Sequence, residues 1–150
     1  MRLFVFIFVV IVSVFSEELE PNSWCSDSFL ENIVFKCLEE YNGILADAYD
    51  FMYLRPAANE RMKCFRACLF NECLSFNSDG NFAANVPATT AFWTSRRNSS
   101  YLQIVEEAAE NCINSLGDEA TICDLTDAYI TCLGENTPHE ITFRGAFNLD

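Results

Sequence analysis

Apolar residues recur along much of this chain at steps of three and four positions, which is the spacing of one face of an α-helix. The first such run covers residues 28–41. Ser28 and Glu31 have the spacing of a capping box at its start, and Gly43 stands just past its end. The run therefore predicts an amphipathic helix, with its apolar positions at Phe29, Ile33, Val34, Cys37, Leu38 and Tyr41.

The strongest helical pattern covers residues 57–75, where Met62, Phe65 and Leu69 form a single apolar stripe. The stretch before it, residues 44–54, is ambiguous in its periodicity. We interpret that stretch as a short helix followed by a turn.

Three further helices are expected in the second half of the chain. Ser100 and Gln103 have capping-box spacing at the start of one of them. No segment alternates convincingly over more than a few residues, so the sequence predicts an all-α domain of about six helices joined by short loops. The remaining segments are a turn at 77–81, helices at 85–97, 100–116 and 119–133, and a tail at 134–150.

The first 16 residues have the features of a secretory signal peptide. Arg2 gives a positive start, residues 3–12 are an unbroken apolar run, and Val14 and Ser16 are small enough for signal peptidase. We expect cleavage after Ser16, with residues 17–150 forming one exported domain. An uncleaved membrane anchor is the alternative, but the apolar run is short for a span and no second one follows.

The formal net charge of the chain is -13, with 22 Asp and Glu against 9 Lys and Arg. The predicted leader holds Arg2 and no acid, so cleavage makes the mature chain more negative still. Such a surface repels polyphosphate and anionic lipid, which argues against nucleic-acid and membrane-surface partners. The 14 Phe, 2 Trp and 5 Tyr are a heavy aromatic load, more than a small core obviously needs.

All eight cysteines lie beyond the leader, and an even number in a short exported chain indicates disulfides. Cys64 and Cys68 share one face of the helix expected at 57–75, where geometry prevents them from bonding to each other. Each must reach a different element, so this helix is predicted to be the hub of the fold. The sequence alone leaves the pairing open.

The hub segment reads Lys-Cys-Phe-Arg-Ala-Cys-Leu-Phe over residues 63–70, and Cys123 and Cys132 are separated by eight residues. With the longer gaps from Cys37 onward, this order of cysteines resembles that of insect odorant-binding proteins of the pheromone and general-odorant type. The resemblance runs from Cys37 to Cys132. It implies three interlocked disulfides, Cys37–Cys68, Cys64–Cys123 and Cys112–Cys132, holding helices around an apolar cavity.

Cys25 and Cys73 depart from that six-cysteine pattern. A fourth bridge between them is the economical expectation, with an intermolecular bond or two free thiols as the alternatives. If Cys25 and Cys73 both lay in antiparallel helices, the distance along the axis from Cys25 to Cys37 would differ from that between Cys68 and Cys73 by roughly 10 Å. The segment before Ser28 would then have to fold back.

Catalytic and metal chemistry is poorly represented in the sequence. The only histidine is His139, with no neighbours that suggest a zinc site or a nucleophile–base pair, so no metal, cofactor or enzymatic activity is predicted. The carboxylate pairs on predicted helices are typical of solvated faces. Asn98-Ser99-Ser100 is an acceptor for N-glycosylation in an exported chain.

The resemblance implies a secreted carrier that solubilises a small apolar ligand of the odorant or pheromone kind. Ile141, Phe143 and Phe147 make the tail unusually apolar, and we expect it to cover the cavity as a lid. For every candidate contact, ordinary core packing is the competing interpretation. The candidates are Phe29, Ile33, Met62, Phe65, Leu69, Trp93, Leu102, Val105, Leu125, Tyr129, Phe143 and Phe147.

The alternative hypothesis is an interaction protein of seminal, salivary or similar fluid that uses the same scaffold to bind a protein partner. The extra cysteines, the acidic charge and the glycosylation acceptor fit it equally well. A receptor and a second copy of the chain are further partners that the sequence leaves open.

Overall fold

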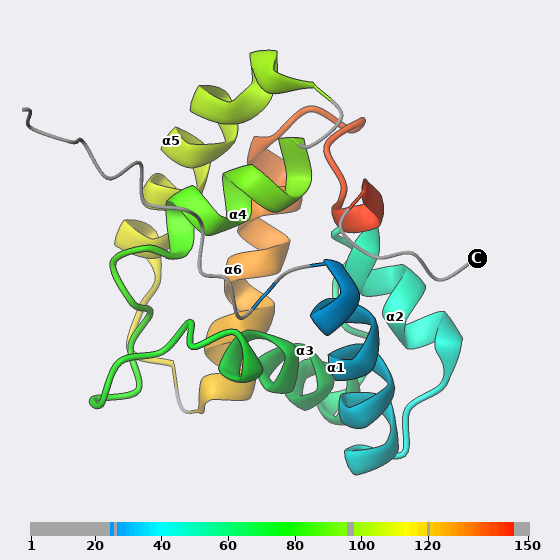
Figure 1. Ribbon diagram of the computed structural model, residues 1–150. Helices are drawn as coiled ribbons and strands as arrows, with labels where there is room; N and C mark the ends of the chain where they lie inside the picture. Colours follow the sequence, from blue (N-terminus) through cyan, green and yellow to red (C-terminus); the bar gives the residue numbers. More distant parts are fainter. Residues whose placement is uncertain (1–24, 26, 96–97, 120, 146–150) are drawn as a thin grey trace, which may run out of the picture.

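The structure is a computed structural model that describes residues 25, 27–95, 98–119 and 121–145. Within these residues the chain forms six α-helices and two short 3₁₀ helices, η2 and η3, and the predicted all-α class is confirmed (Figure 1). The helices are α1 Asp27–Glu40, α2 Leu45–Met52, α3 Glu60–Glu72, α4 Val86–Ser95, η2 Ser99–Tyr101, α5 Leu102–Ser115, α6 Ile122–Asn136 and η3 Phe143–Gly145.

In the view of Figure 1, helix α6 runs through the middle of the molecule, with α5 on its left and α1 and α2 on its right. It packs against α3 and α5, while α4 packs on α5 and α1 on α3. The C-terminal segment returns along this bundle, so that η3 contacts both α2 and α4. None of the helices in the described ranges is long and apolar enough to cross a membrane.

The described residues form four disulfides, and three of them join helices in the pairings that the resemblance implied. Cys37–Cys68 joins α1 to α3, Cys64–Cys123 joins α3 to α6, and Cys112–Cys132 joins α5 to α6. The predicted hub is therefore confirmed, since α3 provides a cysteine to each of two other helices. We call α1, α3, α5 and α6, with their bonds, the disulfide frame.

The fourth bond is Cys25–Cys73, with 5.5 Å between the Cα atoms. The offset that made this pairing look difficult assumed that both cysteines continue straight helices. Cys25 instead lies before the start of α1, and Cys73 is the residue that caps the end of α3. Because neither lies inside a helix, the two chain segments can meet.

The capping box predicted at Ser100 and Gln103 is wrong. Asn98 begins this segment instead, because its Oδ1 accepts a hydrogen bond from the Ser100 backbone N–H at 3.0 Å and starts η2. The Gln103 amide donates to Glu107 Oε1 at 2.8 Å, one turn further along α5. Asn is among the best N-cap residues, and here it acts two positions earlier than Ser100.

The last helix is shifted toward the C-terminus relative to the predicted 119–133. Thr121 caps its start by accepting from the Asp124 backbone N–H at 3.1 Å, and the helix then continues through Gly134 to Asn136. Gly134 is not a helix stop. A Cβ atom at this position would lie 2.7 Å from the Leu54 carbonyl oxygen, so glycine permits a close approach between α6 and the end of α2.

The predicted leader at 1–16 and the part of the tail beyond residue 145 lie outside the described residues. The part of the tail that is described is not peripheral. Ile141 and Phe143 keep only 4% and 0% of their side-chain surface exposed.

Candidate functional site

A connected set of aromatic rings occupies the interior beside η3. The Phe143 ring stacks on that of Phe51 from α2, with 4.9 Å between centroids. Trp93 of α4 approaches the same ring edge-on at 6.1 Å. Three segments of the chain therefore meet at one buried phenyl group.

The rings continue from there into the disulfide frame. Phe70 of α3 lies 6.3 Å from Phe51 and 5.8 Å from Tyr129 of α6, which in turn lies 4.9 Å from Phe82. The Tyr129 hydroxyl donates to Thr90 Oγ1 at 2.9 Å, and burial raises the pKa of Tyr129. The phenol therefore stays protonated and adds a polar point to an otherwise apolar interior.

Most of the predicted ligand contacts are buried. Leu102 is 39% exposed and Leu125 is partly exposed, so these two lie nearer the surface than the prediction assumed. The side chain of Phe29 and the whole of Phe147 lie outside the described residues. The buried members of the set are Ile33, Met62, Phe65, Leu69, Trp93, Val105, Tyr129 and Phe143.

Three residues that connect these positions were missed from the sequence: Phe51, Phe70 and Phe82. Phe51 lies in the stretch with ambiguous periodicity, and Phe82 follows the 77–81 turn. Phe70 is adjacent to the predicted stripe of α3 rather than on it. Since every residue from Phe65 to Phe70 is buried, α3 is a central helix with no single apolar face, and a search for one stripe cannot find all its core positions.

The covalent frame does not enclose all of this interior. Neither α2, α4 nor the C-terminal segment holds a cysteine, and they supply Phe51, Trp93 and Phe143 respectively. This side of the interior is held by noncovalent contacts alone. It can therefore open without breaking a covalent bond, while the opposite side is fixed by four disulfides.

The grooves formed by described residues include ones of about 490, 240 and 450 Å³, and no predicted ligand contact lines these three. The groove of about 490 Å³ is lined by Tyr53, Tyr101 and residues of the C-terminal segment, and His139 lines both it and the groove of about 240 Å³. Across it, the Tyr101 hydroxyl donates to Glu140 Oε1 at 2.8 Å. That hydrogen bond lowers the pKa of Glu140, so its carboxylate is ionised at neutral pH.

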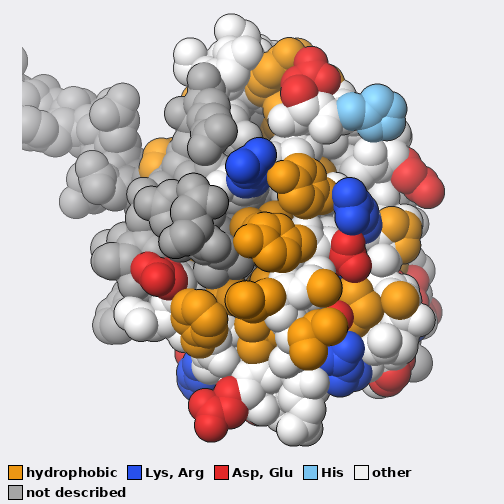
Figure 2. Space-filling view, turned by 90° about the vertical axis from the view of Figure 1, so that its right-hand side faces the viewer, with side chains coloured by type: hydrophobic (Ala, Val, Ile, Leu, Met, Phe, Trp, Pro, Cys, Tyr) orange, Lys and Arg blue, Asp and Glu red, His pale blue; other side chains and the backbone are white. Residues whose placement is uncertain are grey.

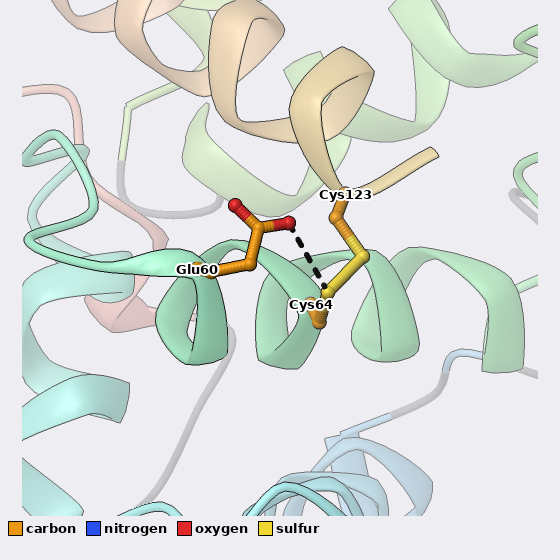
Figure 3. Close-up of side chains that lie close together, drawn as sticks. All are labelled: Glu60, Cys64 and Cys123. Carbon is orange, nitrogen blue, oxygen red and sulfur yellow. Dashed lines mark hydrogen bonds between the residues drawn. A yellow bond between two sulfur atoms is a disulfide. The ribbon is translucent and has the colours of Figure 1, made fainter. Parts of the chain in front are cut away.

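One group with metal-ligand elements occurs among the described residues: Glu60, Cys64 and Cys123, whose ligand atoms lie within 4.8 Å of one another. In Figure 3 the Glu60 carboxylate points at the Cys64 sulfur, 3.8 Å away. Both sulfur atoms are engaged in the Cys64–Cys123 bond. Because metal binding requires a thiolate, the arrangement belongs to the framework rather than to a metal centre.

A helical frame closed by interlocked disulfides, with aromatic side chains filling one unlinked side, defines a small binding domain. The sequence matches the PBP/GOBP family over residues 28–136. This match covers well over half of the chain, so the protein belongs to that family.

Among solved structures, the fold is similar to that of odorant-binding protein OBP28a from Drosophila melanogaster, with a TM-score of 0.62 and 21% sequence identity. The likeness covers 71% of this chain and 88% of the Drosophila chain, and at this identity it concerns the fold. No curated protein matches the sequence. The family and its structural neighbour are binding proteins rather than enzymes.

Proposed function

We propose that the protein is a secreted carrier that encloses one small apolar molecule of the odorant or pheromone kind in its interior. The family match over residues 28–136 carries this proposal. It is supported by the aromatic interior and by the side that lacks covalent links. Export, cleavage after Ser16 and use of the exposed Asn98 acceptor belong to the same proposal.

The ligand enters where α2, α4 and the C-terminal segment meet, and it takes the place of the Phe143 ring. Phe143 is the natural group to displace, because it belongs to a segment that none of the four disulfides holds. Phe51 and Trp93 then contact the ligand instead of Phe143. The tail thus acts as a lid that fills the site when no ligand is bound.

Displacement of Phe143 sets a lower limit on ligand size. Exposing a buried phenyl side chain to water costs about 2–3 kcal/mol, and an apolar ligand gains about 25 cal/mol per Å² that it buries. A molecule no larger than one ring would therefore gain almost nothing net. Binding requires a longer or bulkier ligand, which extends from Trp93 toward Phe70 and Tyr129.

The other predicted contacts form the deeper walls of the proposed site. Ile33, Met62, Phe65, Leu69 and Val105 belong to helices of the disulfide frame and stay in place when the tail moves. They limit how far the ligand can penetrate.

Titration with an apolar fluorescent dye tests the proposal. Wild-type protein should take up the dye saturably, one molecule per chain, and native mass spectrometry should show the same ratio. Phe143→Ala should bind the dye about tenfold more tightly or better, because the ligand no longer competes with a phenyl ring. Phe35→Ala, which removes an exposed ring of α1 outside this contact, is the matched control and should bind like wild type.

The outcomes separate the parts of the proposal. Saturable binding that Phe143→Ala does not strengthen would contradict the lid while leaving the carrier intact. The absence of uptake by both proteins, each shown to be helical by circular dichroism, would contradict the carrier. A stable complex with a protein partner in that case would support the alternative, an interaction protein on the same scaffold.

A further inference from the structure

The groove of about 490 Å³ is lined by Asn98, the acceptor for N-glycosylation. No other Asn-X-Ser or Asn-X-Thr sequence occurs in the chain. Tyr53, which caps the end of α2, lines the same groove together with Tyr101 of η2. The C-terminal segment completes it with residues 139–142 and Arg144. We call it the tyrosine groove.

The lining of the tyrosine groove suits a neutral, polar ligand. Tyrosine rings offer apolar faces for the C–H groups of a sugar, while His139, Glu140 and Arg144 offer hydrogen-bond partners for its hydroxyl groups. Glu140 and Arg144 carry opposite charges, so the lining favours neither an anion nor a cation. In Figure 2 the pale blue side chain is the only histidine of the chain, and hydrophobic, basic and acidic side chains occupy the surface around it. Small-molecule sites have volumes of about 300–1,000 Å³, so a short carbohydrate fits the groove in size as well.

Asn98 is exposed, and it is held in place without using the atom that carries a glycan. Its Oδ1 accepts from the Ser100 backbone N–H at 3.0 Å, and its backbone N–H donates to the Ser95 carbonyl oxygen at 2.6 Å. No hydrogen bond to Nδ2 occurs within the described residues. In glycosylation Nδ2 displaces the diphosphate of a lipid-linked oligosaccharide: the bond from Nδ2 to sugar C1 forms, the bond from C1 to the phosphate oxygen breaks, and Nδ2 loses one proton. The cap survives this reaction, because Oδ1 still accepts.

A glycan on Asn98 begins in the lining of the groove itself. Because it is covalently attached, its contacts with the groove form within one molecule and need not be strong individually. The residues that it would contact on the C-terminal segment stand on both sides of Phe143 in the sequence. The hydrogen bond from Tyr101 to Glu140 already joins η2 to this segment. Sugar residues in the groove would add further contacts between the same two parts of the chain.

We propose that the glycan on Asn98 lies in the tyrosine groove and fastens the C-terminal segment, with Phe143, in its closed position. This inference rests on the proposed function, since it requires export and a tail that moves. Glycosylation then sets how readily the carrier opens. The glycosylated protein is open less of the time and binds an apolar ligand more weakly, although the contacts inside are the same.

Protein secreted from a eukaryotic host, compared with its Ser100→Ala variant, tests the inference. Ser100→Ala removes the acceptor sequence but keeps Asn98 and its cap, because the cap uses the backbone N–H of residue 100. Ser100→Thr preserves the acceptor sequence and is the matched control. Intact mass spectrometry should show a glycan on wild type and on Ser100→Thr. Secreted wild type that carries no glycan on Asn98 would overturn the inference.

Hydroxyl-radical footprinting locates the glycan. Tyr53 should be oxidised more slowly in glycosylated wild type and Ser100→Thr than in Ser100→Ala. Tyr49 provides the internal control, because it belongs to the same helix, is 43% exposed against 38% for Tyr53, and does not line the groove. It should be oxidised at the same rate in all three proteins. A glycan that leaves Tyr53 unprotected, or that protects Tyr49 equally, contradicts the proposed position.

Hydrogen exchange and dye titration test the fastening. Backbone amides of residues 139–144 should exchange about fivefold more slowly in glycosylated wild type than in Ser100→Ala, because local opening is suppressed. The apolar dye should bind the glycosylated protein about fivefold more weakly, because a smaller fraction of it is open. Equal exchange rates in the two proteins would overturn the inference, as would equal dye affinities. If neither protein takes up dye, the carrier is contradicted, and the exchange rates still decide whether the glycan fastens the tail.

Discussion

Arg66 is the largest side chain that is fully buried among the described residues. Its Nη1 donates to Asp127 Oδ1 at 2.7 Å and its Nη2 to the Arg55 carbonyl oxygen at 2.5 Å, while the same Asp127 oxygen accepts from the Ala57 backbone N–H at 3.1 Å. Burial lowers the pKa of Arg66, and the negative charge of Asp127 opposes that effect. One ion pair thus joins α3, α6 and the loop between α2 and α3.

This pair leads to a prediction at the scale of single residues. Asp127→Asn should lower the free energy of unfolding by about 2–4 kcal/mol, because it leaves a buried guanidinium without its counter-charge. This predicted loss is at the lower end for buried ion pairs, since Asp127 is 16% exposed. Urea denaturation measures the change in the free energy of unfolding.

The exposed pair between Arg55 and Asp50 provides the control for Asp127→Asn. Its side chains are 64% and 33% exposed, so Asp50→Asn should cost less than about 1 kcal/mol. If both variants lowered the free energy of unfolding equally, the buried pair would contribute no more to stability than the exposed pair.

At the scale of elements, the contact between α6 and the end of α2 depends on Gly134. The Leu54 backbone comes close enough to exclude a Cβ atom there, and Leu54 itself has a positive φ of 54°. This contact positions the loop that follows α2, the helix that supplies Phe51. It therefore acts, together with the ion pair between Asp47 and Arg61, on a helix that no disulfide reaches.

Gly134→Ala should therefore destabilise the protein, although alanine favours a helix. Overlap with the Leu54 oxygen costs about 1–3 kcal/mol and the gain in helix propensity is about 1 kcal/mol, so we expect a net loss near 1 kcal/mol. Chemical denaturation checks the value.

Gly117→Ala is the comparison, because a Cβ atom at Gly117 meets nothing within 4 Å and this glycine has no positive φ. It should leave stability unchanged or raise it by up to about 1 kcal/mol. A stabilised Gly134→Ala variant would mean that the close approach has no energetic consequence.

At the scale of the whole molecule, covalent and noncovalent constraints are distributed unequally. The disulfides hold α1, α3, α5 and α6, whereas only noncovalent contacts hold α2, α4 and the C-terminal segment. Local opening follows the weakest constraints. The unlinked side is therefore where we propose that a ligand enters.

Removal of the extra bridge, in the double variant Cys25→Ser and Cys73→Ser, should leave the fold intact. Since Cys37–Cys68 already closes the inner loop, the extra bond closes a ring of only roughly 20 further residues and contributes about 3 kcal/mol. The circular dichroism spectrum should match that of wild type while denaturation shifts by that amount. Loss of the helical signal would instead show that the protein needs the Cys25–Cys73 bond to fold.

Much of the element order could be predicted because it depends on local spacing. The short helix in the ambiguous stretch formed as α2, and the hub formed as α3 with Asn59 as its cap. The errors concern helix ends: Asn98 and Thr121 cap helices that were expected to start elsewhere, and α6 continues past the expected end at residue 133. A cap is selected by the geometry of the preceding turn, and periodicity does not report that geometry.

The candidate site was predicted less completely. Trp93, Tyr129 and Phe143 were identified, whereas Phe51, Phe70 and Phe82, which connect them, were not. Arg66 was part of the hub sequence, yet nothing in its neighbours indicates that it is buried. Its partner Asp127 stands 61 positions away, and only folding brings the two together.

The sequence by itself determined the helical class and the cysteines available for a covalent frame, because helix periodicity and cysteine spacing are read within and between neighbouring turns. The tertiary structure decided which aromatic rings contact Phe143, that Gly134 lies against the Leu54 carbonyl oxygen, and that the charge of Arg66 is buried. Those outcomes depend on the packing of segments far apart in the chain, where the environment of a side chain is set by its neighbours in space.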